Sequence, residues 1–279
     1  MSTAHILILG AVAGSTIFLG MPIGRLQVGP AARAALSALA TGILVFLLWD
    51  VLTGAVDPIE SALHAHHWGR FSWLAAIGVA GFTAGLMALV HYSEWMRSRS
   101  HRRASTLVGP GAAAIDEFVH RTWLDTLSAG SQLALLIAIG IGVHNFGEGL
   151  AIGQAAAASQ ISLAVTLIIG FGLHNATEGF GICGPITGEG TRPTWKFLGL
   201  LGLIGGAPTF FGTLLGQAWS SEAASVVFFA IAAGSILYVV QELFAVNRKY
   251  GHTKLVMWLV LTGIVLGFAT DFVVSAAGV

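Results

Sequence analysis

Eight long apolar stretches constrain this chain more than any other feature of its sequence. A hydrocarbon core about 30 Å thick takes about 20 helical residues to cross, and each stretch is long enough to do so. Charged residues make up only 9% of the chain, so the folded chain could not cover its surface in water. The sequence therefore predicts spans at Ile6–Ile23, Ala34–Val56, Phe71–Met96, Gln132–Ala157, Ile161–Ile186, Trp195–Trp219, Ala223–Val246 and Leu255–Ala277.

Helices are expected in these stretches rather than the strands of a membrane barrel. Barrel strands are about 10 residues long and alternate in polarity, whereas these stretches are continuously apolar. Glycine is abundant, with 37 residues, and small residues let membrane helices approach closely. The expected fold is an all-α membrane protein with eight transmembrane helices, forming one domain over residues 1–279.

The Lys and Arg residues predict the orientation of the chain in the membrane. They gather in the odd-numbered loops, above all in the third loop, residues 97–131, and only Arg70 lies in an even-numbered loop. Loops rich in Lys and Arg face the cytoplasm. The third loop is therefore expected to be cytoplasmic, and both termini to be extracellular or periplasmic.

One six-residue pattern occurs twice, near the middle of two consecutive spans. His-Asn-Phe-Gly-Glu-Gly runs from His144 to Gly149, and His-Asn-Ala-Thr-Glu-Gly runs from His174 to Gly179. Ionisable residues at bilayer depth are costly, so they mark a functional site by default. The short turn between the two spans predicts an antiparallel hairpin, which brings both patterns to a similar depth.

Each pattern places a His four residues before a Glu, so the two side chains project from one face of a helix. If the two faces turn toward each other, His144, Glu148, His174 and Glu178 surround one point. Two carboxylates neutralise a divalent cation, which avoids most of the cost of burying its charge. Imidazole and carboxylate suit zinc and related transition metals. The sequence therefore predicts an intramembrane site for such a metal.

Other polar residues in the spans carry weaker predictions. Asn145 follows His144 and can supply a neutral oxygen to the same cavity, and Asn175 holds the matching position after His174. Glu242, near the cytoplasmic end of the seventh span, is either a relay ligand for the metal or an acid that reaches interfacial water. Asp50 and Asp271 lie near outer helix ends and are expected to be hydrated.

Two function classes fit these residues. A metal transporter is favoured because there is no separate catalytic domain, so the chain is not expected to be an enzyme. The rival is an intramembrane metal-dependent hydrolase, in which either motif Glu would act as the general base. No prosthetic group and no nucleic-acid partner are expected. A lone His in a membrane helix is usually a packing residue, and it is the repetition of the pattern that favours a metal site.

With these motifs the chain resembles the ZIP family of divalent-metal transporters, in its divergent prokaryotic form. The resemblance covers all eight spans and is carried by the two patterns beginning at His144 and His174. The stretch Tyr238–Leu243 is similar to a third, looser motif of that family.

The resemblance implies a 3+2+3 arrangement of the spans and movement of metal toward the cytoplasm, carried by helices that shift against a fixed scaffold. Zinc is the favoured metal, with iron, manganese and cadmium as alternatives. The protein is expected to lie in the bilayer of a bacterial inner membrane. Whether it forms a homodimer is left open. Glu242 would lie on the cytoplasmic exit route. The implied metal ligands are His144, Asn145, Glu148, His174, Asn175 and Glu178.

Two departures separate the chain from the family pattern. Gly147 and Thr177 stand where the family usually has Pro before the motif Glu, and a proline kink frees backbone carbonyls. Ala207 precedes Pro208 where prokaryotic members often place a Glu that bridges a second metal. One main metal is therefore expected, and a metal sensor that does not transport is a third interpretation.

Overall fold

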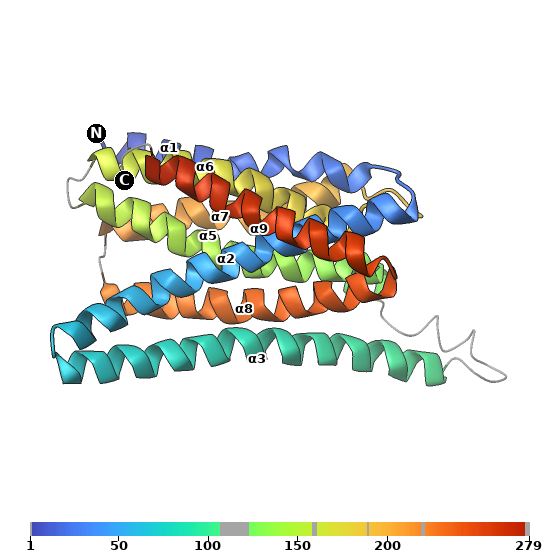
Figure 1. Ribbon diagram of the computed structural model, residues 1–279, viewed down its shortest axis with the longest axis horizontal. Helices are drawn as coiled ribbons and strands as arrows, with labels where there is room; N and C mark the ends of the chain where they lie inside the picture. Colours follow the sequence, from blue (N-terminus) through green and yellow to red (C-terminus); the bar gives the residue numbers. More distant parts are fainter. Residues whose placement is uncertain (1, 107–122, 158–160, 189, 219–220, 277–279) are drawn as a thin grey trace.

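A computed structural model describes residues 2–106, 123–157, 161–188, 190–218 and 221–276 (Figure 1). Within these residues the chain is helical and contains no strand. The long helices are α1 (Thr3–Ser15), α2 (Pro30–His64), α3 (Trp68–Thr106), α5 (Ala129–Ala157), α6 (Ile161–Cys183), α7 (Trp195–Ala218), α8 (Glu222–Lys249) and α9 (Thr253–Ala276). Four short 3-10 helices are η1 (Thr16–Leu19), η2 (Met21–Arg25), η3 (Trp123–Thr126) and η4 (Gly184–Ile186).

Familiar capping residues set several helix ends. The Ser221 hydroxyl accepts a hydrogen bond from the Ala224 N–H at 3.3 Å, and Pro30 opens α2 at a position where its missing N–H costs nothing. Glu222 lies in the first turn of α8 and Lys249 in its last, so both charges complement the helix dipole.

The helices differ in length from the predicted spans in two places. α2 continues to His64 through Pro58, well past the predicted end at Val56. α3 continues to Thr106, so the prediction that residues 97–131 form a loop is wrong for its first ten residues. A helix keeps its backbone hydrogen bonds where it leaves the apolar layer, and Arg is a good helix former. Residues 107–122 of that loop lie outside the described residues.

The surface of the helices is suited to lipid. Seven segments of the described chain are long and apolar enough to cross a membrane, and α6 is not among them. Large apolar side chains point outward, and Trp49, Val79 and Trp258 are at least 62% exposed. A soluble protein rarely exposes apolar surface on this scale. The described chain is therefore an all-α membrane protein.

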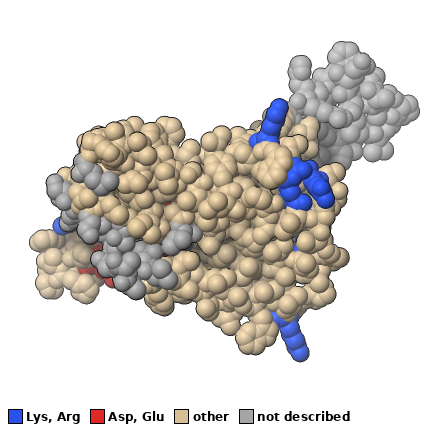
Figure 2. Space-filling view, turned by 90° about the horizontal axis from the view of Figure 1, so that it is seen from above, with Lys and Arg blue, Asp and Glu red and all other residues tan. Residues whose placement is uncertain are grey.

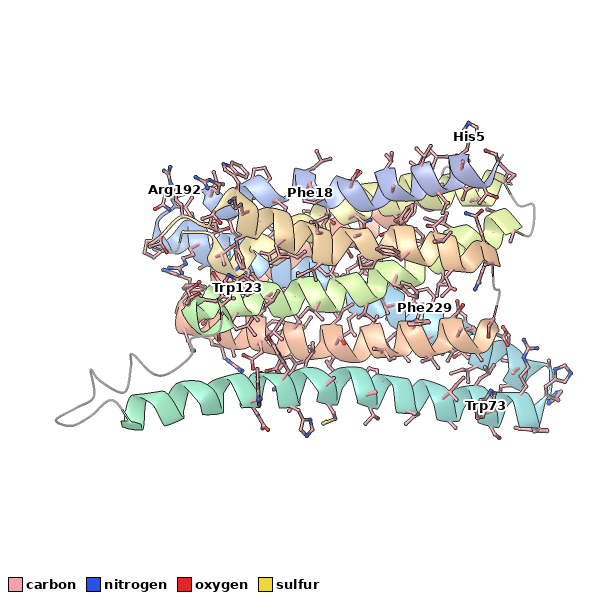
Figure 3. The ribbon with its side chains drawn as sticks, turned by 180° about the vertical axis from the view of Figure 1, so that it is seen from behind. His5, Phe18, Trp73, Trp123, Arg192 and Phe229 are labelled. Carbon is pink, nitrogen blue, oxygen red and sulfur yellow. The ribbon has the colours of Figure 1, made fainter. Side chains whose placement is uncertain are left out.

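Loops that are distant in sequence meet at the two ends of the bundle. At one end, Arg25 donates to the Pro193 carbonyl at 2.7 Å, and Arg33 lies 5.9 Å from the Tyr250 ring. At the other end, Arg70 forms an ion pair with Glu222. In Figure 1, α1 begins and α9 ends at the same end of the bundle, and Figure 3 places Arg192 at the end opposite His5. On the face seen in Figure 2, most Lys and Arg side chains gather toward one end.

The helices pack as two groups, each joined by close backbone contacts at glycines. In the first group, α1, α5, α6 and α7, a methyl group on Gly149 would overlap the Thr209 carbonyl oxygen. In the second group, α2, α3, α8 and α9, a methyl group on Gly42 would overlap the Val260 carbonyl oxygen. The groups meet where α5 packs on α8 and where α6 packs on α2 and α9. The repeated pattern lies on α5 and α6, at this seam.

Candidate metal centre

The predicted hairpin of α5 and α6 places both copies of the pattern inside the protein. His144, Asn145 and Glu148 on α5 are at most 1% exposed, and Asn175 and Glu178 on α6 are fully buried. These two helices pack directly on each other. The described members of the predicted polar faces, His144 and Glu148 on α5 and Glu178 on α6, are therefore turned inward.

His144 is the meeting point of the two carboxylates. Its Nε2 atom lies 3.2 Å from Glu148 Oε1 and 3.7 Å from Glu178 Oε1. The first distance follows from the spacing of four residues on one helix, and the second spans the two helices. An imidazole nitrogen and two carboxylate oxygens, one from each copy of the pattern, thus converge in a space closed to solvent.

The two amides orient the centre. Asn145 Nδ2 donates to Glu178 Oε2 at 2.9 Å and to the Gly205 carbonyl on α7 at 3.0 Å. Asn175 Nδ2 donates to the Ala13 carbonyl on α1 at 3.0 Å. With their NH₂ groups engaged in this way, both carboxamides keep a buried Oδ1 atom that accepts no hydrogen bond from the described residues. These oxygens are neutral donors suited to a cation.

The two remaining predicted ligands are His174, whose side chain the structure does not describe, and Glu242, which lies on another helix. His174 lies on α6, but its side chain is outside the described residues. Among the described residues, no group of three or more His, Cys, Asp or Glu side chains, including His144 with Glu148 and Glu178, is already arranged to hold a metal ion. Glu242 lies on α8, half-buried, with Oε1 3.4 Å from the Tyr238 hydroxyl. It lines a cavity that also touches Leu136, which lies eight residues before His144 on α5.

Asp50 is an acid whose relation to the centre could not be predicted from its own span. It lies on α2, in the second helix group, and interacts electrostatically with His144 and with Asp271 of α9. The expectation that Asp50 is simply a hydrated acid at a helix end is therefore incomplete. The available signal was its position within the predicted span Ala34–Val56, where an acid is costly.

The surroundings of two positions bear on the departures from the ZIP pattern: Gly147, and Pro208 beside Ala207. A methyl group on Gly147 would lie 3.1 Å from the ring of Phe229 on α8, so Gly147 faces the second helix group. Pro208 lies inside α7, and it lines an apolar cavity of about 300 Å³ with Gly142 and Phe228. A proline removes the hydrogen bond to the carbonyl four residues earlier, here that of Ile204.

Comparisons with known proteins agree with the motifs. Residues 96–275 match the family described as ZIP Zinc transporter. The chain is 27% identical over 269 residues to the zinc transporter ZupT of Escherichia coli O1:K1 / APEC, covering 94% of this chain and 95% of that protein. ZupT of Escherichia coli strain K12 / DH10B matches with the same identity and coverage.

These matches confirm the resemblance inferred from the two patterns. They also set aside the hydrolase interpretation, because the family is one of transporters and not of enzymes. The match covers well over half of the chain and includes both patterns and the stretch around Glu242. The chain belongs to the ZIP zinc transporter family.

Proposed function

We propose that this protein carries a divalent transition metal, with zinc favoured, across the bacterial inner membrane toward the cytoplasm. The observation that carries the proposal is the meeting of His144 Nε2 with Glu148 and Glu178, from two helices, in a fully buried space. Membership of the ZIP family supports metal transport. The named relatives are zinc transporters, which favours zinc among the candidate metals.

The spacing of the donor atoms supports a tetrahedral metal. Zinc binds imidazole nitrogen and carboxylate oxygen at about 2.0–2.2 Å, so two tetrahedral ligands lie about 3.4 Å apart. The two distances from His144 Nε2, 3.2 and 3.7 Å, bracket this value. We assign His144, Glu148 and Glu178 as ligands, and we expect His174 or one of Asn145 and Asn175 to complete the set.

The charge of the loaded centre supports a divalent ion. Two carboxylates balance a dication, and a neutral imidazole adds no charge, so the assembly is nearly neutral. Ala207 offers no carboxylate from α7 where a second metal would need one. We therefore propose one main metal ion for each protein, with no prosthetic group.

The proposed topology has eight spans in a 3+2+3 order, with both termini outside and residues 97–131 on the cytoplasmic side. It is supported by the meeting of odd-numbered loops at one end and by the ion pair of Arg70 with Glu222 at the other. The chain forms one transmembrane domain, with the bilayer as its surrounding. A homodimer stays compatible with this arrangement.

The proposed route runs along the seam between the helix groups. Asp50 on α2 would receive the metal from the outer side, the α5–α6 centre would hold it, and Glu242 on α8 would receive it on the cytoplasmic side. The ligands of the centre lie on one helix group, whereas Asp50 and Glu242 lie on the other. Sliding of the first group against the second would carry the metal between the two acids.

The proposal is tested by zinc uptake into proteoliposomes with a metal-sensitive dye inside. We expect accumulation that saturates with zinc and is absent from protein-free liposomes. Parallel runs with iron, manganese and cadmium rank the metals. Tight zinc binding without any accumulation would instead indicate a metal sensor. If the protein neither binds nor accumulates any of these metals, the proposal of a metal function is wrong.

Asp50→Asn is expected to raise the KM for zinc about tenfold, with a smaller change in the maximal rate. The reason is that an outer carboxylate attracts the ion before it enters the centre, and such a charge acts mainly on capture. Asp57→Asn, an exposed acid on the same helix, is the matched control and should leave the KM unchanged. Equal effects of the two variants would contradict a specific role for Asp50.

A further inference from the structure

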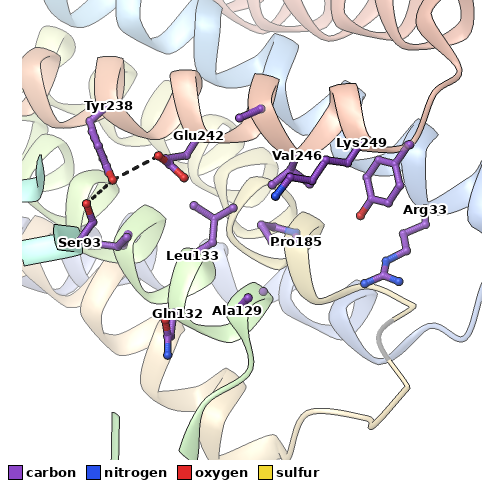
Figure 4. Close-up of a pocket in the computed structure, with 14 residues that line it drawn as sticks. Arg33, Ser93, Ala129, Gln132, Leu133, Pro185, Tyr238, Glu242, Val246 and Lys249 are labelled. Carbon is purple, nitrogen blue, oxygen red and sulfur yellow. Dashed lines mark hydrogen bonds between the residues drawn. The ribbon is translucent and has the colours of Figure 1, made fainter. Parts of the chain in front are cut away.

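The cavity that Glu242 lines opens at the end of the bundle where the odd-numbered loops meet. Its volume is about 600 Å³, and it lies between α2, α3, α5, η4 and α8. Figure 4 shows Ser93, Tyr238 and Glu242 toward one end of the cavity and Arg33 and Lys249 toward the other. The proposed metal route uses Glu242 alone, so the basic end of the cavity has no assigned role.

Two cations, Arg33 and Lys249, line this end of the cavity. Neither Arg33 nor Lys249 forms an ion pair within the described residues. The Arg33 Nε atom is buried and makes no hydrogen bond there, although its guanidinium lies 5.9 Å from the Tyr250 ring. A buried polar group without a hydrogen bond is costly, so this nitrogen points to a missing acceptor.

A helix terminus adds further donors to the same cavity. Ala129 and Gly130, the first two residues of α5, line it, and no acidic residue lies in the first turn of that helix. Ser128 accepts from Ser131 N–H at 3.1 Å, whereas the N–H groups of Ala129 and Gly130 have no partner inside the helix. The start of a helix carries a partial positive charge and favours anions.

The summed charge selects an anion over a cation. Among the described residues that line the cavity, Arg33 and Lys249 bring two positive charges against one carboxylate, that of Glu242, which lies two turns away from Lys249 on α8. An arginine and a lysine beside free helix N–H groups match the oxygens of a phosphate group. The cavity has room for a phosphate with a small organic group attached.

We propose that the basic end of this cavity binds a phosphate-bearing anion, held by Arg33, Lys249 and the start of α5. The anion is either free phosphate from the cytoplasm or the headgroup of an anionic lipid. Arg33 and Lys249 belong to the second helix group and α5 to the first, so the bound anion joins the two groups and stabilises their present arrangement. Binding of the anion does not depend on zinc transport.

The test measures thermal unfolding of delipidated, zinc-free protein in detergent with added sodium phosphate. Saturating phosphate is expected to raise the unfolding temperature by about 5 °C, whereas sodium chloride at equal ionic strength should not. A second arm compares nanodiscs of phosphatidylcholine alone with nanodiscs that also contain phosphatidylglycerol. Stabilisation by phosphate identifies the free anion, and stabilisation only by phosphatidylglycerol identifies the lipid headgroup.

Variants decide whether the effect belongs to this cavity. Arg33→Gln and Lys249→Gln should each weaken binding at least tenfold. Arg248→Gln removes the same charge from an exposed neighbour outside the cavity and should keep the stabilisation. Lys249 is exposed, so its variant stays informative if Arg33→Gln does not fold. The proposal is overturned if the protein is stabilised in neither arm, or if all three variants lose the stabilisation equally. Zinc uptake by the unaltered protein tests the proposed function separately and does not depend on that outcome.

Discussion

Glu148→Gln is expected to lower zinc uptake at least about 100-fold at a fixed amount of protein in the liposomes. The substitution keeps the volume of the side chain but removes one of the two charges that balance the metal. Loss of a residue that merely supports a ligand costs about 10–100-fold in metal affinity, so loss of a ligand itself should cost more. Glu178→Gln should have an effect of the same size, because both carboxylates meet His144.

The matched control for this prediction is Glu94→Gln, the same chemical change at an exposed position on α3. It should leave uptake unchanged. Unfolding temperature and elution from a sizing column show that the variants fold. Folded Glu148→Gln protein that transports zinc at the normal rate would disprove the proposed centre, whatever the behaviour of Glu178→Gln.

The fold could largely be predicted because the bilayer demands continuous apolar helices. Backbone groups in lipid must bond within their own segment, so an apolar run of sufficient length has one structural solution. The ends of α2 and α3 could not be predicted in this way. Once a helix leaves the apolar layer, polar residues such as those after Met96 continue it equally well, and hydropathy no longer marks where it stops.

The candidate centre could be predicted in part for a similar reason. The spacing of His144 and Glu148 fixes one edge of the centre, since both lie on one helix. The contact of His144 with Glu178 needed the hairpin, which the short turn made predictable. The donor groups of Asn145 and Asn175 could not be assigned, because they bond to carbonyls of α7 and α1, which are distant in sequence.

Asp50 shows the limit of reasoning from single spans. Its place near the outer end of the predicted span Ala34–Val56 suggested contact with water, whereas α2 in fact continues to His64. The residues that it interacts with electrostatically, His144 and Asp271, lie on α5 and α9, so this interaction depends on how three helices are arranged. Whether a charged residue in a predicted span is hydrated or belongs to a site is therefore better predicted from the depth of the polar residues on the other spans. Its distance from a helix end is less informative.

The interface between α5 and α7, within the first helix group, connects helix packing with the metal centre. Gly149 directly follows Glu148, and a methyl group there would overlap Thr209 and Thr213 backbone atoms of α7. On the same helix, the Gly205 carbonyl accepts from Asn145, which also donates to Glu178. The distance between α5 and α7 thus sets the position of an amide that holds one of the two carboxylates.

Gly149→Ala is accordingly expected to destabilise the protein by about 1–3 kcal/mol, the usual cost of forcing extra atoms into a packed interior. Ala is ordinarily favoured over Gly within a helix by about 1 kcal/mol, so a net loss would show that the clash exceeds this gain. Thermal unfolding in detergent measures the change. The affinity for zinc should fall as well, since a larger distance between α5 and α7 moves the Gly205 carbonyl away from Asn145.

Gly199→Ala separates this effect from a general response to alanine. Gly199 lies on α7, and a methyl group there meets no atom within 4 Å, so this variant should be as stable as the original protein or slightly more stable. Equal behaviour of the two variants would mean that α7 moves aside at little cost. The close approach of α5 and α7 at Gly149 would then contribute little to the stability of the protein.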